Sequence, residues 1–198
     1  KSRLATLPSL GVQGVMVRDI GQVEWARSSG LFTLYGDMGL NVFNKYTLLV
    51  LKQLGLKGVT LSSELTLYQI KDIHRLNCME TEVIAYGRLP LMITRNCPVG
   101  SVLNKDLRTK KYCGCKGKHY GLIDRKGVVF PLLTDYLTCR TEVINSKPLF
   151  LADKLDDIVL SGVHCIRLLF TIEDPTECRR IVNMYAHSLE KGQDAMIE

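Results

Sequence analysis

The stretch GVTLSSELTLYQIKDIHRLNCMETEVIAY, residues 58–86, holds two apolar runs separated by a segment with helical periodicity. The runs Gly58–Leu61 and Glu82–Tyr86 are short and rich in Val and Ile, which is typical of strands buried on both faces. Between them, Leu67–Leu76 carries apolar residues at helical spacing. A strand, a helix and a second strand in this order predict a right-handed βαβ unit with parallel strands.

The same order repeats on both sides of this unit. Strand starts recur about every 17 to 27 residues over the first four strands, close to the repeat of an eightfold βα-barrel of ~250 residues. No Gly-x-Gly-x-x-Gly follows the first strand, which argues against a dinucleotide-binding fold. The predicted fold class is therefore α/β, an incomplete βα-barrel with parallel strands; an open doubly wound sheet is the alternative. The other expected strands are Gly14–Arg18, Leu31–Tyr35 and Cys165–Thr171, and the other expected helices are Gly21–Ser28, Lys45–Leu54, Asp153–Ser161 and Asp174–Lys191.

One stretch, residues 95–149, interrupts the alternation. It has no helical period, and Tyr120–Leu132 reads as a hairpin that turns at Asp124–Gly127. An irregular insertion of this length is usually functional, and this one leaves the carboxyl end of the fourth strand, where barrel enzymes keep their chemistry. We therefore expect three segments: βα units of a barrel (1–94), a cysteine-rich metal-binding insertion (95–149) and a final βα unit (150–198).

The insertion holds four of the seven cysteines: Cys97, Cys113, Cys115 and Cys139. Thiolates group in this way where a metal orders a loop that lacks a core of its own. Four thiolates, or three with His119, would bind zinc, and four would equally hold an iron–sulfur cluster, so the residues alone leave both metals open. The plain alternative is four unrelated reduced cysteines. A disulfide framework is not expected, because the seven cysteines are an odd number in a chain that reads as cytoplasmic.

Polar side chains gather at or just beyond the expected strand ends. Since parallel strands of a barrel end on the same side, these side chains are expected to converge on one substrate mouth. For any one of them, a helix cap or loop hydrogen bond is the plain alternative. A guanidinium such as that of Arg88 can grip a carboxylate or phosphate with two bonds. The candidate catalytic residues are Arg88 and Glu64, and the candidate substrate-binding residues are Asp37, Asn41, Asn44 and Tyr86.

Charge points to anionic partners. The chain has a formal net charge of +6, and the insertion is rich in Lys and Arg, which suits RNA or an anionic small molecule, although a solvated loop explains it equally well. We see no apolar run of membrane-spanning length and no signal peptide, so no membrane partner and a cytoplasmic location are expected. Met16, Trp25 and Met92 are expected in the core.

Seven segments together resemble the collagenase-like peptidase family, the unassigned-type peptidase family numbered 32. The similarity is collinear from about Gly11 to Lys191 and covers the later part of the family's barrel domain. The segments are GDMGLNVFN (Gly36–Asn44), VTLSSEL (Val59–Leu65), EVIAYGRLPLM (Glu82–Met92), NCPVG (Asn96–Gly100), DRKGVVFPLLTD (Asp124–Asp135), CRTEVINSKPL (Cys139–Leu149) and IRLLFTIE (Ile166–Glu173).

The resemblance implies a [4Fe–4S] cluster on four cysteines. The cysteine of the Asn-Cys-Pro motif is Cys97, that of the Cys-Arg-Thr motif is Cys139, and the loop ligands are Cys113 and Cys115. In several relatives a first cysteine stands where this chain has Pro90. The Cys113/Cys115 pair is expected to supply the missing ligand; the alternative is a labile three-cysteine cluster.

The resemblance also implies a function. Family members were named as proteases, yet the better understood ones look like oxygen-independent hydroxylases of RNA or ubiquinone precursors, some with prephenate as the hydroxyl donor. An iron–sulfur hydroxylase acting on RNA or a small aromatic is therefore expected. The alternatives are a peptidase and a non-catalytic fragment with structural zinc or a structural cluster. Because five units cannot close a barrel, Gly14–Arg18 is expected to have an unpaired edge, covered by the remainder of a longer chain or by a second copy.

Overall fold

The computed structural model describes residues 6–103, 117–135 and 137–194, with side chains described up to residue 190. The chain forms two compact units. The first, which we call the parallel-sheet unit, comprises residues 1–85, 151–168 and 180–198. The second, the small-sheet unit, comprises residues 86–150 and 169–179. The three-segment division expected from the sequence stays a prediction.

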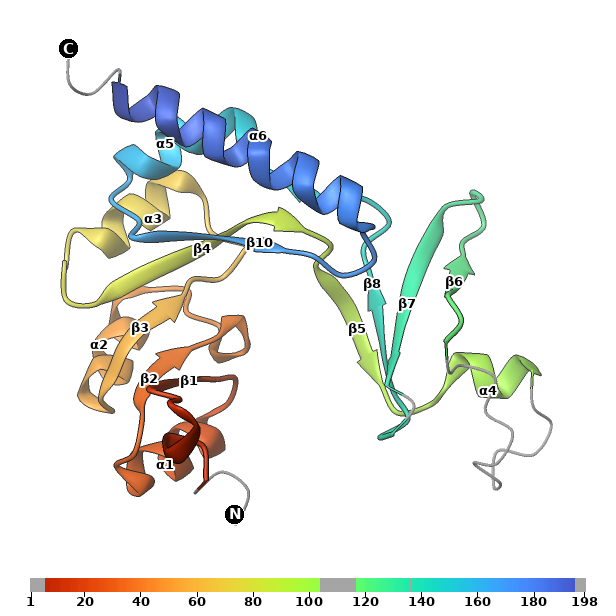
Figure 1. Ribbon diagram of the computed structural model, residues 1–198, viewed down its shortest axis with the longest axis horizontal. Coiled ribbons are helices and arrows are strands. Elements are labelled where there is room, and N and C mark those ends of the chain that lie inside the picture. Colours follow the sequence, from red (N-terminus) through yellow and green to blue (C-terminus); the bar gives the residue numbers. More distant parts are fainter. Residues whose placement is uncertain (1–5, 104–116, 136, 195–198) are drawn as a thin grey trace. The chain divides into compact units, whose positions relative to one another are not determined.

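A curled parallel sheet of five strands forms a half-barrel (Figure 1). Its strand order is β1-β2-β3-β4-β10, and one α-helix follows each of the first three strands before the next one, as the βαβ pattern predicts. This confirms the incomplete barrel. Among the described residues β1 pairs only with β2, which places it at an edge of this sheet. The strands are β1 Gly14–Val17, β2 Thr33–Gly36, β3 Leu56–Thr60, β4 Glu80–Gly87 and β10 Cys165–Leu169.

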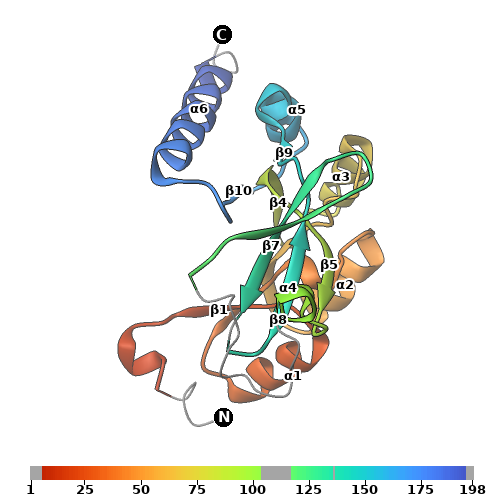
Figure 2. The same ribbon diagram turned by 90° about the vertical axis from the view of Figure 1, so that its right-hand side faces the viewer.

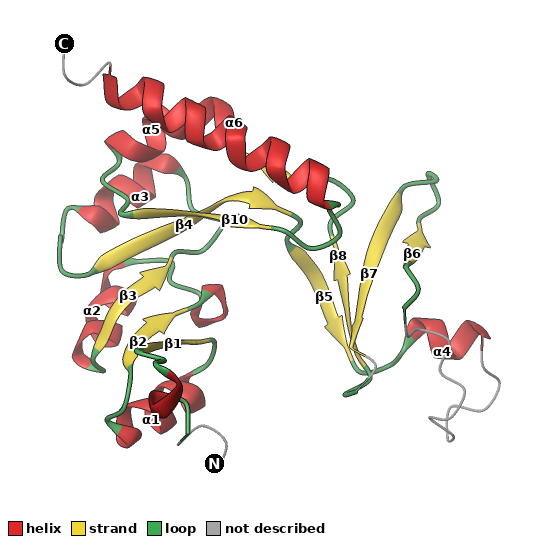
Figure 3. Cartoon of the chain, in the orientation of Figure 1, coloured by secondary structure: helices red, strands yellow, loops and turns green. Residues whose placement is uncertain are grey.

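Side-chain caps fix where the helices of this unit begin. Asp19, Asn44 and Thr66 each accept a backbone N–H of the first turn, and Thr66 forms a capping box with Gln69. Figure 3 shows these helices as coils along the sheet. The helices are α1 Ile20–Ser29, α2 Lys45–Gln53, α3 Leu67–His74, α5 Leu155–Leu160 and α6 Pro175–Asp194, with short 3-10 turns η1 Pro8–Leu10, η2 Met38–Leu40 and η4 Ala152–Lys154.

The core of the parallel-sheet unit lies between the sheet and these helices. Val59 and Leu61 at β3 and Leu51 on α2 are almost fully buried. Tyr185 of α6 is also buried, and its hydroxyl donates to the backbone carbonyl of Ala85 at 2.8 Å. Burying each such side chain contributes roughly 1.5–3 kcal/mol to folding. This face of the sheet carries most of the buried apolar side chains, whereas the concave face carries Thr60, Glu82 and Arg167.

The small-sheet unit contains an antiparallel sheet in the order β5-β8-β7-β6. Figure 2 labels three of its strands, β5, β7 and β8. The hairpin expected at Tyr120–Leu132 is present: Tyr120 pairs with Leu132, and the turn is closed by the backbone N–H of Gly127 on Asp124. A strand of two residues, β9, pairs antiparallel with the end of β4. The strands are β5 Pro90–Thr94, β6 Tyr120–Ile123, β7 Val129–Asp135, β8 Arg140–Ile144 and β9 Leu149–Phe150.

Two features of the described residues differ from the expectations. The insertion contains a short helix, α4 Pro98–Leu103, whose Val99 packs against Leu132 and Val143. Met16 and Met92 are both 49% exposed, so the core assignment was wrong for them, because Met16 lies on the polar concave face and Met92 on a half-open small sheet. No helix in the described part of the chain is long and apolar enough to cross a membrane.

Candidate functional site

A single guanidinium links the strands on the concave face of the parallel-sheet unit. Arg167 of β10 donates from Nη1 to Asp37 Oδ1 at 2.6 Å and from Nη2 to Thr60 Oγ1 at 3.0 Å. The same Nη2 lies 2.5 Å from Glu82 Oε1 and 3.0 Å from Met16 Sδ. Arg167 therefore contacts side chains carried by β1, β3 and β4 and by the residue that follows β2.

Asp37, a predicted substrate-binding residue, is engaged by two cations. Arg18 Nε lies 3.0 Å from Asp37 Oδ2, while Arg167 holds Oδ1. The Asp37 side chain is 13% exposed, so these contacts compensate a largely desolvated carboxylate. Burial by itself lowers the pKa of Arg167, but Asp37 and Glu82 outweigh it and raise that pKa. The Arg167 guanidinium therefore stays positively charged at neutral pH.

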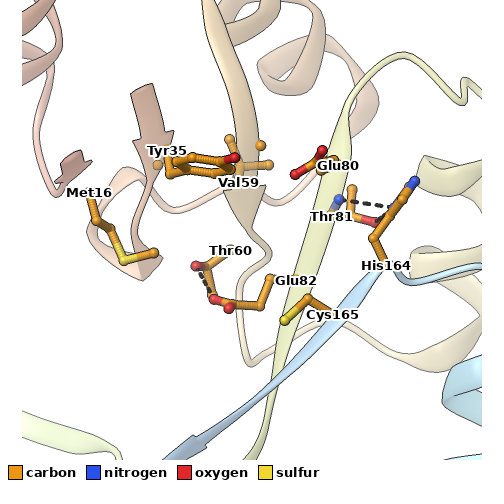
Figure 4. A pocket seen from close by; sticks show the side chains of 11 residues that line it. Met16, Tyr35, Val59, Thr60, Glu80, Thr81, Glu82, His164 and Cys165 are labelled. Atoms are coloured by element: carbon orange, nitrogen blue, oxygen red, sulfur yellow. Dashed lines mark hydrogen bonds between the residues drawn. The ribbon is translucent and has the colours of Figure 1, made fainter. Parts of the chain in front are cut away.

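A pocket of about 370 Å³ opens beside this network (Figure 4). Its walls include Tyr35, Glu80, Glu82 and Cys165, all on the concave face. Glu82 accepts a 2.7 Å hydrogen bond from Thr60 Oγ1. Burial, and then the charge of Glu82, raises the pKa of the Cys165 thiol. A cavity of this size, with a largely apolar wall and a few carboxyl and hydroxyl groups, is a candidate ligand site.

Arg88, a candidate catalytic residue, lies in the small-sheet unit. Its Nη1 donates to the backbone carbonyls of Asn145 (3.1 Å) and Ser146. Its Nε is buried without a hydrogen-bond partner among the described residues and lies 3.9 Å from Glu173 Oε1. One side of the guanidinium is thus used to hold the chain after β8.

Glu173 is the carboxylate at the centre of this second cluster, and its side chain is 2% exposed. Burial alone would raise the pKa of Glu173, but the backbone N–H groups of Thr171 and Ile172 donate to Oε2, and the pKa is lowered. Tyr86 donates to Oε1 at 3.3 Å. Burial, followed by the charge of Glu173, raises the pKa of Tyr86 to about 12. Tyr86 is therefore a hydrogen-bond donor at neutral pH.

The remaining strand-end candidates lie in the parallel-sheet unit. Asn44 caps α2, accepting the backbone N–H groups of Tyr46 and Thr47 at 3.0 Å. Asn41 ends η2 in the left-handed region, with φ 48°. Glu64 is exposed in the turn before α3. Because Arg88 and Tyr86 belong to the other unit, a mouth shared by all these residues stays a prediction.

Two of the four predicted metal ligands are described, and pairing registers place them at one end of the small sheet. Thr94 of β5 pairs with Thr141 of β8 in an antiparallel pair. Cys97 comes three residues after Thr94, and Cys139 two residues before Thr141. The chain leaving β5 and the chain entering β8 therefore lie at the same end.

The start of β6 faces that end as well. β6 runs antiparallel to β7, and β7 runs antiparallel to β8, with Asp135 opposite Arg140 at the last described pair. The residues before Tyr120 therefore approach the sheet from the side of Cys97 and Cys139. Cys115 precedes Tyr120 by five residues in the sequence, and both Cys113 and Cys115 lie outside the described residues.

Cys97 has surroundings that suit a metal-bound thiolate. Its side chain is half-buried against the Val99–Leu132–Val143 cluster, and its Sγ accepts the backbone N–H of Gly100 at 3.2 Å. A backbone donor of this kind stabilises negative charge on sulfur. Cys139 is half-buried and has φ 55°, which turns the chain sharply into β8. Within the described residues, no group of three or more Cys, His, Asp or Glu side chains is arranged to hold a metal.

A second pocket, of about 560 Å³, lies next to this end of the small sheet. Thr138 and Arg140, which flank Cys139, both line it, together with Arg95. Its acidic residues are Asp135 and Glu142, and Glu142 forms an ion pair with Arg140. The Thr138 hydroxyl and the backbone N–H of Leu137 hold the pKa of Asp135 below its usual value.

Sequence reasoning missed Glu82, Arg167 and Glu173, which organise the two charged clusters. Arg167 carried a readable signal, since it is an isolated charge within the apolar run Cys165–Thr171, whereas Glu82 stands at the start of its run, two residues after Glu80. A charge on a buried strand is rarely left without a partner. Glu173 follows its strand by four residues and carried no comparable signal.

The comparison with known proteins agrees with the family resemblance of the sequence motifs. No curated protein and no solved structure matches the chain. The model of the family described as peptidase family U32 matches residues 1–196. Since the match spans essentially the whole sequence, the chain belongs to peptidase family U32.

Proposed function

We propose that this chain is part of an iron–sulfur enzyme, an oxygen-independent hydroxylase of RNA or of a small aromatic molecule. The proposed ligands of its [4Fe–4S] cluster are Cys97, Cys113, Cys115 and Cys139. The observation that carries the proposal is the register of the small sheet, which brings the residues flanking Cys97 and Cys139 to one end. Five residues span at most about 18 Å, so Cys115 is within reach of that end through Tyr120.

The chain's own groups support a cluster there. The Gly100 N–H offsets negative charge on the Cys97 sulfur. Arg95 and Arg140 stand two residues before Cys97 and directly after Cys139 in the sequence, so the segments that carry both cysteines are basic. When bound, a cluster of this type supplies one-electron redox chemistry. Arg95 and Arg140 also line the adjacent pocket, where they could bind an anionic hydroxyl donor such as prephenate through paired hydrogen bonds.

The metal is tested by anaerobic purification and reconstitution of the full chain. We expect a brown protein that contains iron and acid-labile sulfide in equal amounts. Cys97→Ser and Cys139→Ser should each lose most of the iron. Cys78→Ser and Cys178→Ser are matched controls, since those cysteines are also half-buried free thiols, and they should retain it. A colourless protein that binds zinc through the same four cysteines would overturn the cluster.

The reaction is tested separately. RNA from cells that overproduce the chain should contain a nucleoside with one added oxygen atom, absent with Cys97→Ser. Gelatin cleavage that a point substitution abolishes, together with no change in the RNA or in small aromatics, would favour a peptidase instead.

A further inference from the structure

The pocket on the concave face of the parallel-sheet unit has acidic and aromatic walls. Glu80 and Glu82 are two residues apart on β4, so both side chains leave the same face of the strand. Figure 4 shows them on one side of the pocket, with the ring of Tyr35 on the other. No Lys or Arg is among the described residues that line it.

Both carboxylates keep acceptor capacity. The ion pair of Glu80 is with Lys57 Nζ, at 3.2 Å from Oε1. Thr60 and Arg167 both contact Glu82 at Oε1. A carboxylate has about four acceptor positions on its two oxygens. Each therefore can accept additional N–H donors from the pocket side.

Lys57 shows that the edge of the pocket, at Tyr35 and Glu80, can hold a cation. Its Nζ lies 5.8 Å from the centroid of the Tyr35 ring while it pairs with Glu80, and its side chain is 55% exposed. An ammonium of the chain itself is thus placed between an aromatic face and a carboxylate, an arrangement that attracts cations. Because Lys57 is half-exposed, solvent or a competing cation can replace it at little cost.

The space between these walls depends on Gly58. A Cβ at this position would lie 3.0 Å from Glu80 Cβ and 3.1 Å from Tyr35 Cδ1, tighter than ordinary contacts. We propose that the pocket binds a small organic cation, a guanidinium or alkylammonium compound. Its N–H groups donate to Glu80 and Glu82, and its carbon chain packs on Tyr35 and Met16.

The local electrostatics agree with this assignment. The pKa of Cys165 is raised first by burial and then by Glu82 and Glu80, while Arg167 acts in the opposite direction. Negative charge therefore dominates at the thiol despite the nearby guanidinium. The site lies in a different unit from the proposed cluster, and the proposal is independent of it.

The test is calorimetric titration of the full chain with agmatine and arginine. Citrulline is the control ligand, because it replaces the guanidinium of arginine with a neutral group of nearly the same shape. We expect agmatine and arginine to bind, with an affinity that falls as salt rises. Citrulline should bind at least about tenfold more weakly, since its charge-assisted hydrogen bonds are lost.

Variants locate the site. Glu80→Gln and Glu82→Gln should each weaken agmatine binding by about tenfold. Lys57→Met should strengthen it, because a competing ammonium is removed and the stem is kept. Glu24→Gln, on the outer helix α1, should leave it unchanged. Circular dichroism checks that each variant folds. Equal binding of citrulline and arginine, no binding of any cation, or affinities unmoved by both Glu80→Gln and Lys57→Met would each overturn the proposal.

Discussion

Arg167 Nη1 lies 2.6 Å from Asp37 Oδ1, although 130 positions separate the two residues in the sequence. The pair joins β10, one edge of the curled sheet, to the residue that follows β2. Both side chains are largely buried, at 20% and 13% exposed. The contact therefore holds the curvature of the half-barrel as well as neutralising its concave face.

Replacing Arg167 by Met should destabilise the parallel-sheet unit by about 2 kcal/mol, because the partly buried carboxyl groups of Asp37 and Glu82 lose their shared partner. The expected value is below that of a fully buried pair, since solvent reaches part of the network. Urea unfolding measures it. Arg27→Met removes an exposed ion pair with Glu24 on α1 and should change little. Equal stability losses in the two variants would contradict this view of the network.

Acid should destabilise the protein partly through Glu173. Its pKa is lowered in the folded state, so its contribution to stability is present above the unfolded value and lost as pH falls through the folded one. In urea melts from about pH 6 to about pH 3, Glu173→Gln should flatten the loss of stability with falling pH. Glu190→Gln, on the exposed part of α6, should keep the wild-type slope. A wild-type slope in Glu173→Gln would mean that this carboxyl is not stabilised by folding.

Alkylation of Cys165 by iodoacetamide should be slow at neutral pH, because its pKa is raised and the thiolate is the reactive form. Glu82→Gln should speed it severalfold, since the negative charge beside the thiol is removed. Peptide mass spectrometry follows each cysteine separately. If the rate at Cys165 falls or stays the same in Glu82→Gln, the carboxylate does not control this thiol.

The free edge of β1 should promote self-association. Gln13 O and Val17 O accept hydrogen bonds from the β2 side, so the backbone of Gly14 and Met16 points away from the sheet. We expect a concentration-dependent dimer in sedimentation velocity. Met16→Pro removes an outward N–H without breaking the β1–β2 ladder and should reduce dimer formation, whereas Met16→Leu should not. A monomer at all concentrations would refute the edge contact.

Much of the half-barrel could be predicted because its signals are local. Val83, Ile84 and Ala85 form an unbroken apolar run, which only a strand with both faces covered can bury. The capping side chains Asp19 and Asn44 stand directly before the helices they start. The incomplete barrel followed from the repetition of such units.

The small sheet and the charged clusters could not be predicted to the same extent. β5 begins at Pro90, a residue that argues against a strand interior, and α4 has six residues, too few for a helical period. The partners of Arg167 lie far along the chain, so no local pattern identifies them. Arg88 was expected to bind a ligand. Its Nη1 instead donates to the backbone carbonyls of Asn145 and Ser146, which lie more than 50 residues away in the sequence, so no local pattern indicates this contact.

The position of Arg167 in the chain has a consequence for synthesis. Asp37 and Glu82 leave the ribosome well before β10. Until then the nascent sheet carries two carboxyl groups on its concave face without Arg167, the cation that contacts both of them. Carboxylates of this kind resist desolvation until they are paired. We therefore expect the first four strands to stay loosely packed during translation and to close only when Arg167 arrives, which makes the half-barrel fold as one late event.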